Sequence, residues 1–210
     1  MALGPTHEPL DSVRYLGNRS SGRMGVAIAR ALQRAGCDVR TLAGPCRPDG
    51  LDSLPDVRRF RTAEDLRDLI SNAWPGCDLL VMAAAVADWR PASTFEGKRR
   101  RSGAPPTLEL QAVPEILGSL SSRPDQFVVG FALEPAEQLL DSAREKLARK
   151  RADCIVANPL ETMDAPDVQG TLVWADGRTE SPGARLAKDE FAAWLCDRVV
   201  PAARVRRDSV

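Results

Sequence analysis

The run LLVMAAA, at residues 79–85, is the clearest indication of the fold. It is continuously apolar and is flanked by polar and Pro-containing sequence, which is the pattern of a strand buried on both faces of a sheet. Such strands belong to parallel sheets covered by helices, and ligands bind there beyond the carboxyl ends of the strands. Asp88, just past the end of this strand, is therefore a candidate functional carboxylate.

Strand-like and helix-like segments alternate on both sides of this run, as they do in βαβ units. Helical spacing of apolar residues predicts helices at 23–35, after Thr62, from Pro114 to Leu120, around 139–147 and around 191–195. Further strands are expected at 39–42, 127–132, 154–157 and 171–175. Thr62 with Asp65 is a capping box, and Asp176-Gly177 is a hairpin turn. The sequence predicts an α/β fold: a Rossmann-like, mainly parallel sheet with helices on both faces and a C-terminal hairpin.

One domain is expected over residues 1–203, followed by a frayed tail at 204–210. Within it, residues 91–106 change to Pro, Gly and Ser around the basic run Lys98-Arg99-Arg100-Arg101. Too few apolar residues are present there to pack against a core. This segment is predicted to be a mobile basic flap.

Composition narrows the class of protein. The 29 basic and 29 acidic residues cancel, so no summed field attracts nucleic acid or an anionic membrane. Neither a run of about 20 apolar residues nor a signal pattern is present, which predicts a cytoplasmic protein without a membrane partner. The five cysteines lack CxxC spacing and His7 is the single histidine, so a zinc site, a disulfide framework and a Ser/His/Asp triad are not expected.

NRSSGRMG, at residues 18–25, lies directly before a predicted helix and is rich in small and hydroxyl residues. Backbone N–H groups at a helix start, with the positive end of the helix dipole behind them, suit a phosphate. The alternative is a tight turn with a Ser N-cap, because the spacing is neither GxGxxG nor GxxxxGK[ST]. Asp88 has a similar alternative: it could hold a metal or a sugar hydroxyl, or it could cap a turn.

Six segments, in this order, resemble the bacterial phosphopantothenoylcysteine synthetase family: Glu8–Arg14, Asn18–Gly25, Ala84–Arg90, Lys98 in its basic run, Val129–Ala132 and Ile155–Asn158. The resemblance covers nearly the whole chain. It implies a stand-alone ligase of coenzyme A biosynthesis and a homodimer. The flavin-dependent decarboxylase that is fused to this unit in most bacteria would be a separate pathway neighbour.

The resemblance implies a two-step reaction. The carboxylate of 4′-phosphopantothenate attacks the α-phosphorus of CTP, with Mg²⁺, and cysteine then displaces CMP to give 4′-phosphopantothenoylcysteine; ATP is the less expected nucleotide. By the resemblance, Asn18 and Lys98 are catalytic, while Arg14 and Ala85 contact the substrate. Nucleotide contacts are implied for Ser20, Ser21, Gly22, Ala87, Asp88, Trp89, Lys98, Phe131 and Ala132, and Asp88 is also the metal candidate.

The sequence departs from the family's pattern in three places. Arg100 and Arg101 stand where the flap motif has lysines, which keeps the charge and changes the phosphate geometry. Val113-Pro114 stands in place of an Asn-Pro pair. The first strand is short, so we expect either a longer N-terminus or a truncated central strand, and an upstream extension should raise the melting temperature.

Two other classes of protein stay open. An NAD(P)-binding Rossmann reductase would use the Gly-rich turn, but Gly22 and Gly25 do not complete its fingerprint. Asp38 is also too close to the loop for the usual spacing of about 20 residues. A non-catalytic nucleotide or nucleic-acid binder would use the basic run, although the balanced charge and the few aromatic residues argue against it.

Overall fold

Strand β6 (Leu79–Ala85) forms over the residues that the apolar run predicts, and it lies near the middle of an eight-stranded sheet. The computed structural model describes residues 1–100 and 107–209. The sheet has the order β13-β12-β10-β9-β6-β1-β4-β5 and is parallel from β10 to β5. Strands β12 and β13 are antiparallel and form the expected C-terminal hairpin. The other strands are β1 (Ala2–Pro5), β4 (Thr41–Ala43), β5 (Val57–Arg59), β9 (Phe127–Glu134), β10 (Cys154–Pro159), β12 (Thr171–Trp174) and β13 (Thr179–Glu180).

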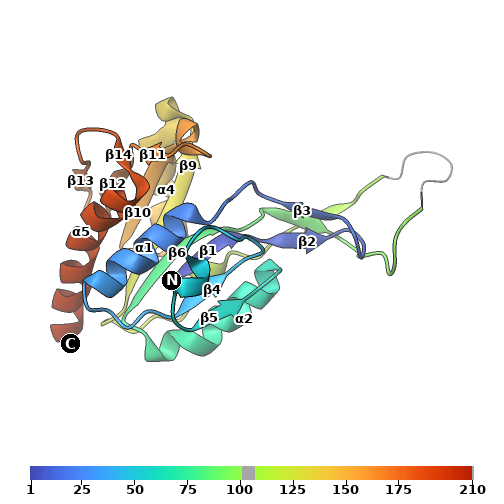
Figure 1. Ribbon diagram of the computed structural model, residues 1–210, viewed down its shortest axis with the longest axis horizontal. Coiled ribbons are helices and arrows are strands. Elements are labelled where there is room, and N and C mark those ends of the chain that lie inside the picture. The colour runs from blue at the N-terminus through green and yellow to red at the C-terminus, as the bar shows by residue number, and fades with distance from the viewer. Residues whose placement is uncertain (101–106, 210) are drawn as a thin grey trace.

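Helices cover both faces of the sheet (Figure 1). Alternate strand residues, such as Leu3, Val81 and Val129, pack against α1 (Arg23–Arg34) and α5 (Lys188–Asp208). Their neighbours face α2 (Ala63–Ala73), α3 (Ile116–Ser119) and α4 (Leu139–Lys150) on the other side. Burial on both faces explains the continuous apolar run of β6. The Rossmann-like α/β fold predicted from the sequence is confirmed.

Helix ends follow local chemistry. Helix α2 begins with the expected capping box: Thr62 Oγ1 accepts from the N–H of Asp65 at 3.1 Å, and the Asp65 carboxylate accepts from the N–H of Thr62 at 2.9 Å. Helix α3 begins at Ile116 rather than at Pro114, because Val113 donates its N–H to Asp88 and Glu115 keeps an extended backbone. Helix α5 continues through Asp208, so residues 204–208, expected to be frayed, are helical. Arg204, which donates to the carbonyl of Ala35, ties this end of α5 to α1.

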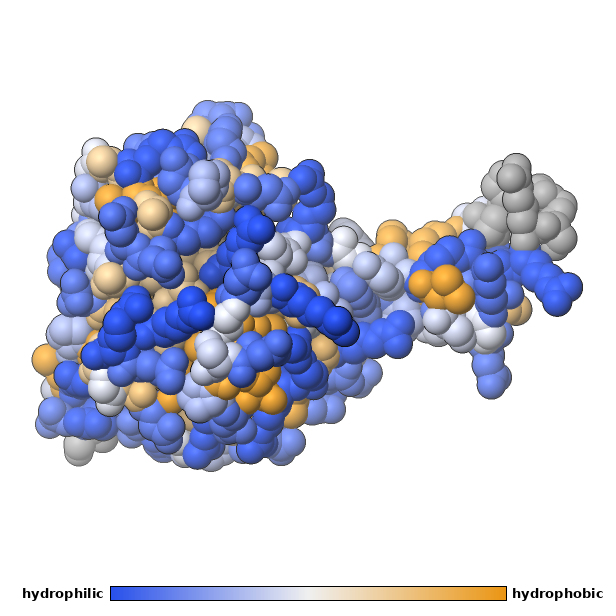
Figure 2. Space-filling model, in the orientation of Figure 1, coloured by the Kyte–Doolittle hydropathy of each residue, from blue (hydrophilic) through white to orange (hydrophobic). Residues whose placement is uncertain are grey.

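A two-hairpin arm projects from the body (Figures 1 and 2). One hairpin pairs β2 (His7–Pro9) with β3 (Tyr15–Gly17), and the other pairs β7 (Trp89–Pro91) with β8 (Leu110–Ala112). The segment predicted to be a flap thus begins in a ribbon, and its residues 101–106, with Arg101, lie outside the described residues. A smaller pair joins β11 (Asp167–Val168) to β14 (Leu186–Ala187). Among the described residues, no helix has the length and apolar character needed to cross a bilayer.

Candidate active site

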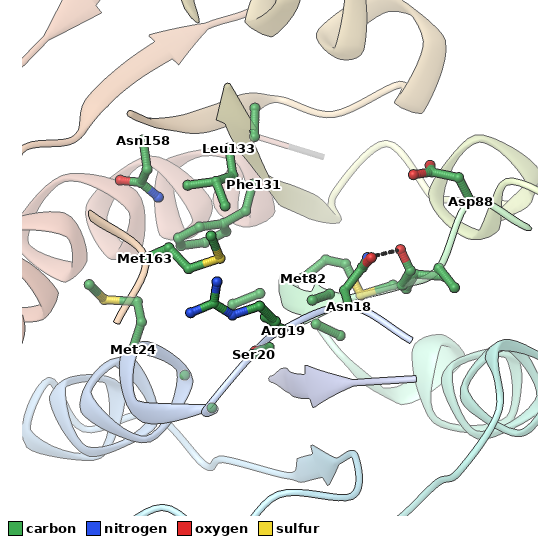
Figure 3. Close-up of a pocket in the computed structure, with 18 of the residues that line it drawn as sticks. Asn18, Arg19, Ser20, Met24, Met82, Asp88, Phe131, Leu133, Asn158 and Met163 are labelled. Carbon is green, nitrogen blue, oxygen red and sulfur yellow. Dashed lines mark hydrogen bonds between the residues drawn. The ribbon is translucent and has the colours of Figure 1, made fainter. Parts of the chain in front are cut away.

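A cavity of about 990 Å³ opens at the carboxyl ends of β6, β9 and β10 (Figure 3). One wall is the loop that precedes α1, and another is the segment from Val113 to Leu117. This is the position at which parallel α/β sheets bind ligands. The cavity therefore lies at the edge of the sheet where the sequence predicts functional residues.

The loop before α1 presents the helix start to this cavity. Gly22 is the N-cap, with a φ of 76°, and no side chain caps the helix. The Ser N-cap that was the alternative interpretation is thus absent from this helix. A Cβ atom on Gly25 would lie 2.3 Å from Leu3 Cβ, so glycine lets α1 approach β1 closely. The first turn of α1 lines the cavity. The N–H of Arg23 donates to Ser21 Oγ at 3.5 Å, and the N–H groups of Met24 and Gly25 have no side-chain acceptor among the described residues, so they suit an anion.

Two hydrogen bonds fix the segment that leaves β6. The side-chain amide of Asn18 donates to the carbonyl of Val86 at 2.9 Å, and the N–H of Ala87 donates to the buried Oγ1 of Thr6 at 3.0 Å. Asp88 follows as an exposed carboxylate on the cavity wall. Asn18 therefore joins the loop before α1 to the exit of β6.

The opposite wall is apolar with one orphaned polar atom. Phe131 and Leu133 from β9 lie near Met163, and Asn158 stands at the end of β10 (Figure 3). Asn158 is only 8% exposed, and its Oδ1 has no hydrogen-bond partner among the described residues. This oxygen is fully buried and lies against Gly170, where an added Cβ would be 2.7 Å away, so Oδ1 packs against the backbone and does not open to the cavity. No role for Asn158 was predicted from the sequence, although its place at the carboxyl end of a predicted strand was a signal.

Cations from α4 complete the cavity. Lys146 Nζ donates to Glu134 at 2.5 Å and Lys150 Nζ to Glu115 at 2.9 Å. The hydrogen bond from Lys146 holds the pKa of Glu134 below its usual range. Sequence reasoning missed both lysines, although their i, i+4 spacing puts them on one helix face. Across the cavity, Arg19 pairs with Asp164 at 2.5 Å.

Lys188, at the start of α5, adds a further cation to the cavity wall. Burial lowers the pKa of its ammonium group, and the nearby positive charge of Arg23 lowers it further. Asp164 and Asp167 partly offset this effect. The lining nevertheless has two more basic than acidic side chains: Arg19, Arg23, Lys146, Arg149, Lys150 and Lys188 against Asp88, Glu115, Glu134 and Asp164. The cavity is therefore electrostatically prepared for a negatively charged ligand.

The structure brings most of the predicted site residues together. The cavity is lined by Asn18, Ser20, Ser21, Gly22, Ala85, Ala87, Asp88, Phe131 and Ala132. Arg14, Trp89 and Lys98 are not among the lining residues, because they belong to the arm that leaves the body (Figure 1). Within this chain, the predicted contacts of these three residues with the same cavity are therefore not formed.

No group of three or more potential metal ligands is present among the described residues, and Asp88 lines the cavity as an exposed carboxylate. Mg²⁺ commonly uses one or two carboxylates together with substrate phosphates. A carboxylate such as Asp88, acting together with substrate phosphates, fits that pattern.

The fold and the cavity define a Rossmann-like α/β protein with a cavity beyond the carboxyl ends of its central strands. The chain matches the DNA/pantothenate metabolism flavoprotein C-terminal domain over residues 1–202, and it belongs to this family.

Known relatives are similar over nearly the whole chain. The chain is 37% identical over 217 residues to the coenzyme A biosynthesis bifunctional protein CoaBC of Mycolicibacterium smegmatis, covering 95% of this chain and 51% of that protein. The crystal structure of a CoaBC C-terminal domain has a TM-score of 0.77 at 28% identity, covering 94% of this chain and 91% of that one. A Cab2 variant in complex with phosphopantothenate-cysteine shares the fold, with a TM-score of 0.68 at 19% identity, covering 99% of this chain and 85% of that one. The chain spans about half the length of the curated relatives it matches.

Proposed function

We propose that the chain is a ligase that joins 4′-phosphopantothenate to L-cysteine in coenzyme A biosynthesis. The observation that carries this proposal is the cavity, in which a helix start and the cations of α4 face each other across the strand ends. The similarity to CoaBC over 95% of the chain supports the pathway. A flavin-dependent decarboxylase is the proposed pathway neighbour.

The first step needs two anions to meet. A carboxylate oxygen of 4′-phosphopantothenate would attack the α-phosphorus of the nucleotide, and the bond from that phosphorus to the pyrophosphate leaving group would break. The N–H groups beside Ser20, Ser21 and Gly22, with Lys146 and Lys150 opposite, offset the repulsion between these anions. Holding both substrates in line lowers the barrier further.

The second step forms the amide. The amine of cysteine would attack the acyl carbon, the bond to the nucleotide phosphate would break with release of the nucleoside monophosphate, and the nitrogen would lose a proton. We assign Asn18 and the backbone of Ala85 to the acyl intermediate, since both border the exit of β6. Fixed donors at this exit favour the charge that develops on the reacting oxygen.

The base would lie toward β9 and β10. Phe131 and Ala132 supply an apolar wall, and Asn158 lines the cavity beside it. Ala87 offers backbone groups on the other side. We propose CTP as the nucleotide, with ATP as the competitor in the assay below.

Magnesium completes the charge balance of this proposal. Asp88 would hold Mg²⁺ together with the nucleotide phosphates. The ion supplies positive charge to the phosphate oxygens during transfer. The reducing cytoplasm is the proposed compartment, which the five free cysteines support.

We also propose a homodimer in which the arm of one copy approaches the cavity of another. Arg14, Trp89 and Lys98 would then reach a site that they do not reach in their own chain. Large apolar side chains exposed on the arm support such a contact: Val13, Tyr15, Trp89, Phe95, Leu108 and Leu110. Analytical ultracentrifugation should give twice the chain mass, and a monomer at assay concentration would contradict the dimer.

A pyrophosphate assay tests the ligase. The purified chain is mixed with 4′-phosphopantothenate, cysteine, Mg²⁺ and either CTP or ATP, and pyrophosphate and the amide product are measured. Release of pyrophosphate that depends on 4′-phosphopantothenate is expected, faster with CTP. Binding of NAD(P)H without any amide product would favour the Rossmann reductase instead.

A further inference from the structure

Asp11 is a buried carboxylate in the arm, in the loop between β2 and β3. Its side chain is 1% exposed. The Arg14 guanidinium, together with the N–H groups of Val13, Arg14 and Arg99, holds the pKa of Asp11 well below its usual range. A buried charge is costly unless it is paired and hydrogen-bonded, so this one depends on what it contacts.

Its contacts join two loops that are far apart in the sequence. Asp11 Oδ1 accepts from the N–H groups of Val13 and Arg14 at 2.9 and 2.8 Å. Its Oδ2 accepts from Arg14 Nε at 2.9 Å and Nη2 at 2.5 Å, and from the N–H of Arg99 at 3.2 Å. Arg14 Nη2 also donates to the carbonyl of Arg99 at 3.0 Å. Both polar backbone groups of Arg99 are thus held by the Asp11–Arg14 pair.

Two backbone hydrogen bonds attach the residues that precede Lys98 to the same loop. The N–H of Ser12 donates to the carbonyl of Gly97 at 3.1 Å, and the N–H of Phe95 donates to Leu10 at 3.0 Å. Lys98 itself is exposed. Its two chain neighbours are therefore fixed to the loop that carries Arg14, while its side chain stays available.

We propose that Asp11 is a positioning residue that holds Arg14 and Lys98 as one unit for the transfer reaction. This inference rests on the proposed ligase function. Two cations on separate loops would otherwise sample independent positions, and misplacing a reacting group by about 1 Å can reduce the rate about 100-fold. The buried carboxylate removes that freedom.

A kinetic cycle tests this role. Asp11→Asn should lower kcat about 100-fold, while the KM for the nucleotide stays nearly unchanged because the cavity residues are untouched. In the Lys98→Ala background, Asp11→Asn should cause a smaller further loss, since one of the two groups that it positions is gone. Asp125→Asn is the matched control: Asp125 also pairs with an arginine, Arg123, outside the arm, and kcat should not change.

Amide hydrogen exchange gives a second readout that does not need activity. Asp11→Asn should speed exchange at residues 97–100 and at 13–14 together, with the unfolding temperature of the body retained. An unchanged kcat, a loss that simply adds to that of Lys98→Ala, or unchanged exchange at 97–100 would each overturn the inference. If wild type forms no amide product, the ligase proposal fails, and the exchange data still decide whether Asp11 couples the two loops.

Discussion

Asn18 donates its side-chain amide to the backbone carbonyl of Val86 at 2.9 Å, which joins the loop before α1 to the segment that follows β6 (Figure 3). The two segments form adjacent walls of the cavity. One short side chain thus sets the spacing between the proposed nucleotide phosphates and the proposed acyl group.

Replacing Asn18 should therefore affect turnover far more than stability. Asn18→Ala removes a donor at the reacting centre, for which losses of about 100-fold to 1000-fold in kcat are typical. Because the residue is exposed, the free energy of unfolding should fall by only about 1 kcal/mol. Pyrophosphate release and thermal unfolding measure the two effects. Asn72→Ala, at an exposed position on α2, should alter neither; equal losses in both variants would contradict the role of Asn18.

Lys150 should act on nucleotide affinity. Lys150→Met would remove the proposed charge-assisted hydrogen bond to a phosphate, worth about 1.5–3 kcal/mol, and would leave Glu115 in the cavity without its lysine partner. The KM for the nucleotide should therefore rise about 10-fold to 100-fold. Steady-state kinetics with varied CTP measure this. Arg144→Met is the control, since Arg144 pairs with Asp141 on the same helix and does not line the cavity. A KM shift shared by both variants would point to the fold of α4 instead.

Gly25 should tolerate alanine poorly despite its helical position. Alanine normally stabilises a helix interior by about 1 kcal/mol relative to glycine. Here the new Cβ would lie 2.3 Å from Leu3 Cβ, and such overpacking costs about 1–3 kcal/mol. Gly25→Ala should therefore lower the free energy of unfolding and weaken nucleotide binding.

Gly36→Ala is a control for Gly25→Ala, because it introduces backbone strain without close packing. Gly36 has a φ of 77° with no atom within 4 Å of an added Cβ, so it should lose stability through strain alone and keep nucleotide affinity. Denaturant unfolding and nucleotide titration of both variants give the comparison. Stabilisation by Gly25→Ala would show that α1 does not need to approach β1 so closely.

Protonation of His7, in strand β2 of the arm, should make the free energy of unfolding depend on pH. Its ring stacks on Tyr15 with centroids 3.5 Å apart. Burial, and then the charge of Arg61, lower the pKa of His7. Because the unfolded chain binds the proton at higher pH, the free energy of unfolding should decrease as pH falls from about 6.5 through the lower folded value.

The single histidine makes this testable by proton NMR, which reads the His7 pKa directly. His7→Gln should remove this part of the pH dependence and leave that of the carboxylates. A folded-state pKa at or above the ordinary histidine value would refute the expected direction.

Elements could be predicted from the sequence where burial or local hydrogen bonding leaves a recognisable pattern of residues. The run that becomes β6 is apolar on both faces, and Thr62 with Asp65 forms a cap from local bonds alone. The arm left no such pattern, because its strands are three residues long and keep large apolar side chains such as Trp89 and Phe95 exposed. Their polar surroundings favoured the interpretation as a flap.

The site was predictable in part for the same reason. Residues in the loop before α1 and at the exit of β6 are fixed by the topology of a parallel sheet, so their convergence follows from the fold. The contributions of Lys146 and Asn158 depend on how α4 and β10 are oriented over the cavity, which no local pattern states. The separation of Lys98 from the cavity depends on the direction of the arm, which is also a property of tertiary structure.

The position of strand β1 in the sheet affects the order in which the strands can pair during folding. This strand lies between β6 and β4, and β6 follows only after α1, β4, β5 and α2 in the chain. The centre of the sheet must therefore wait for a distant segment, and such non-local pairing slows folding and exposes strand edges meanwhile. Asn18 cannot donate to Val86 until β6 has paired with β1. Nucleotide binding should therefore appear late in folding, when the sheet is complete.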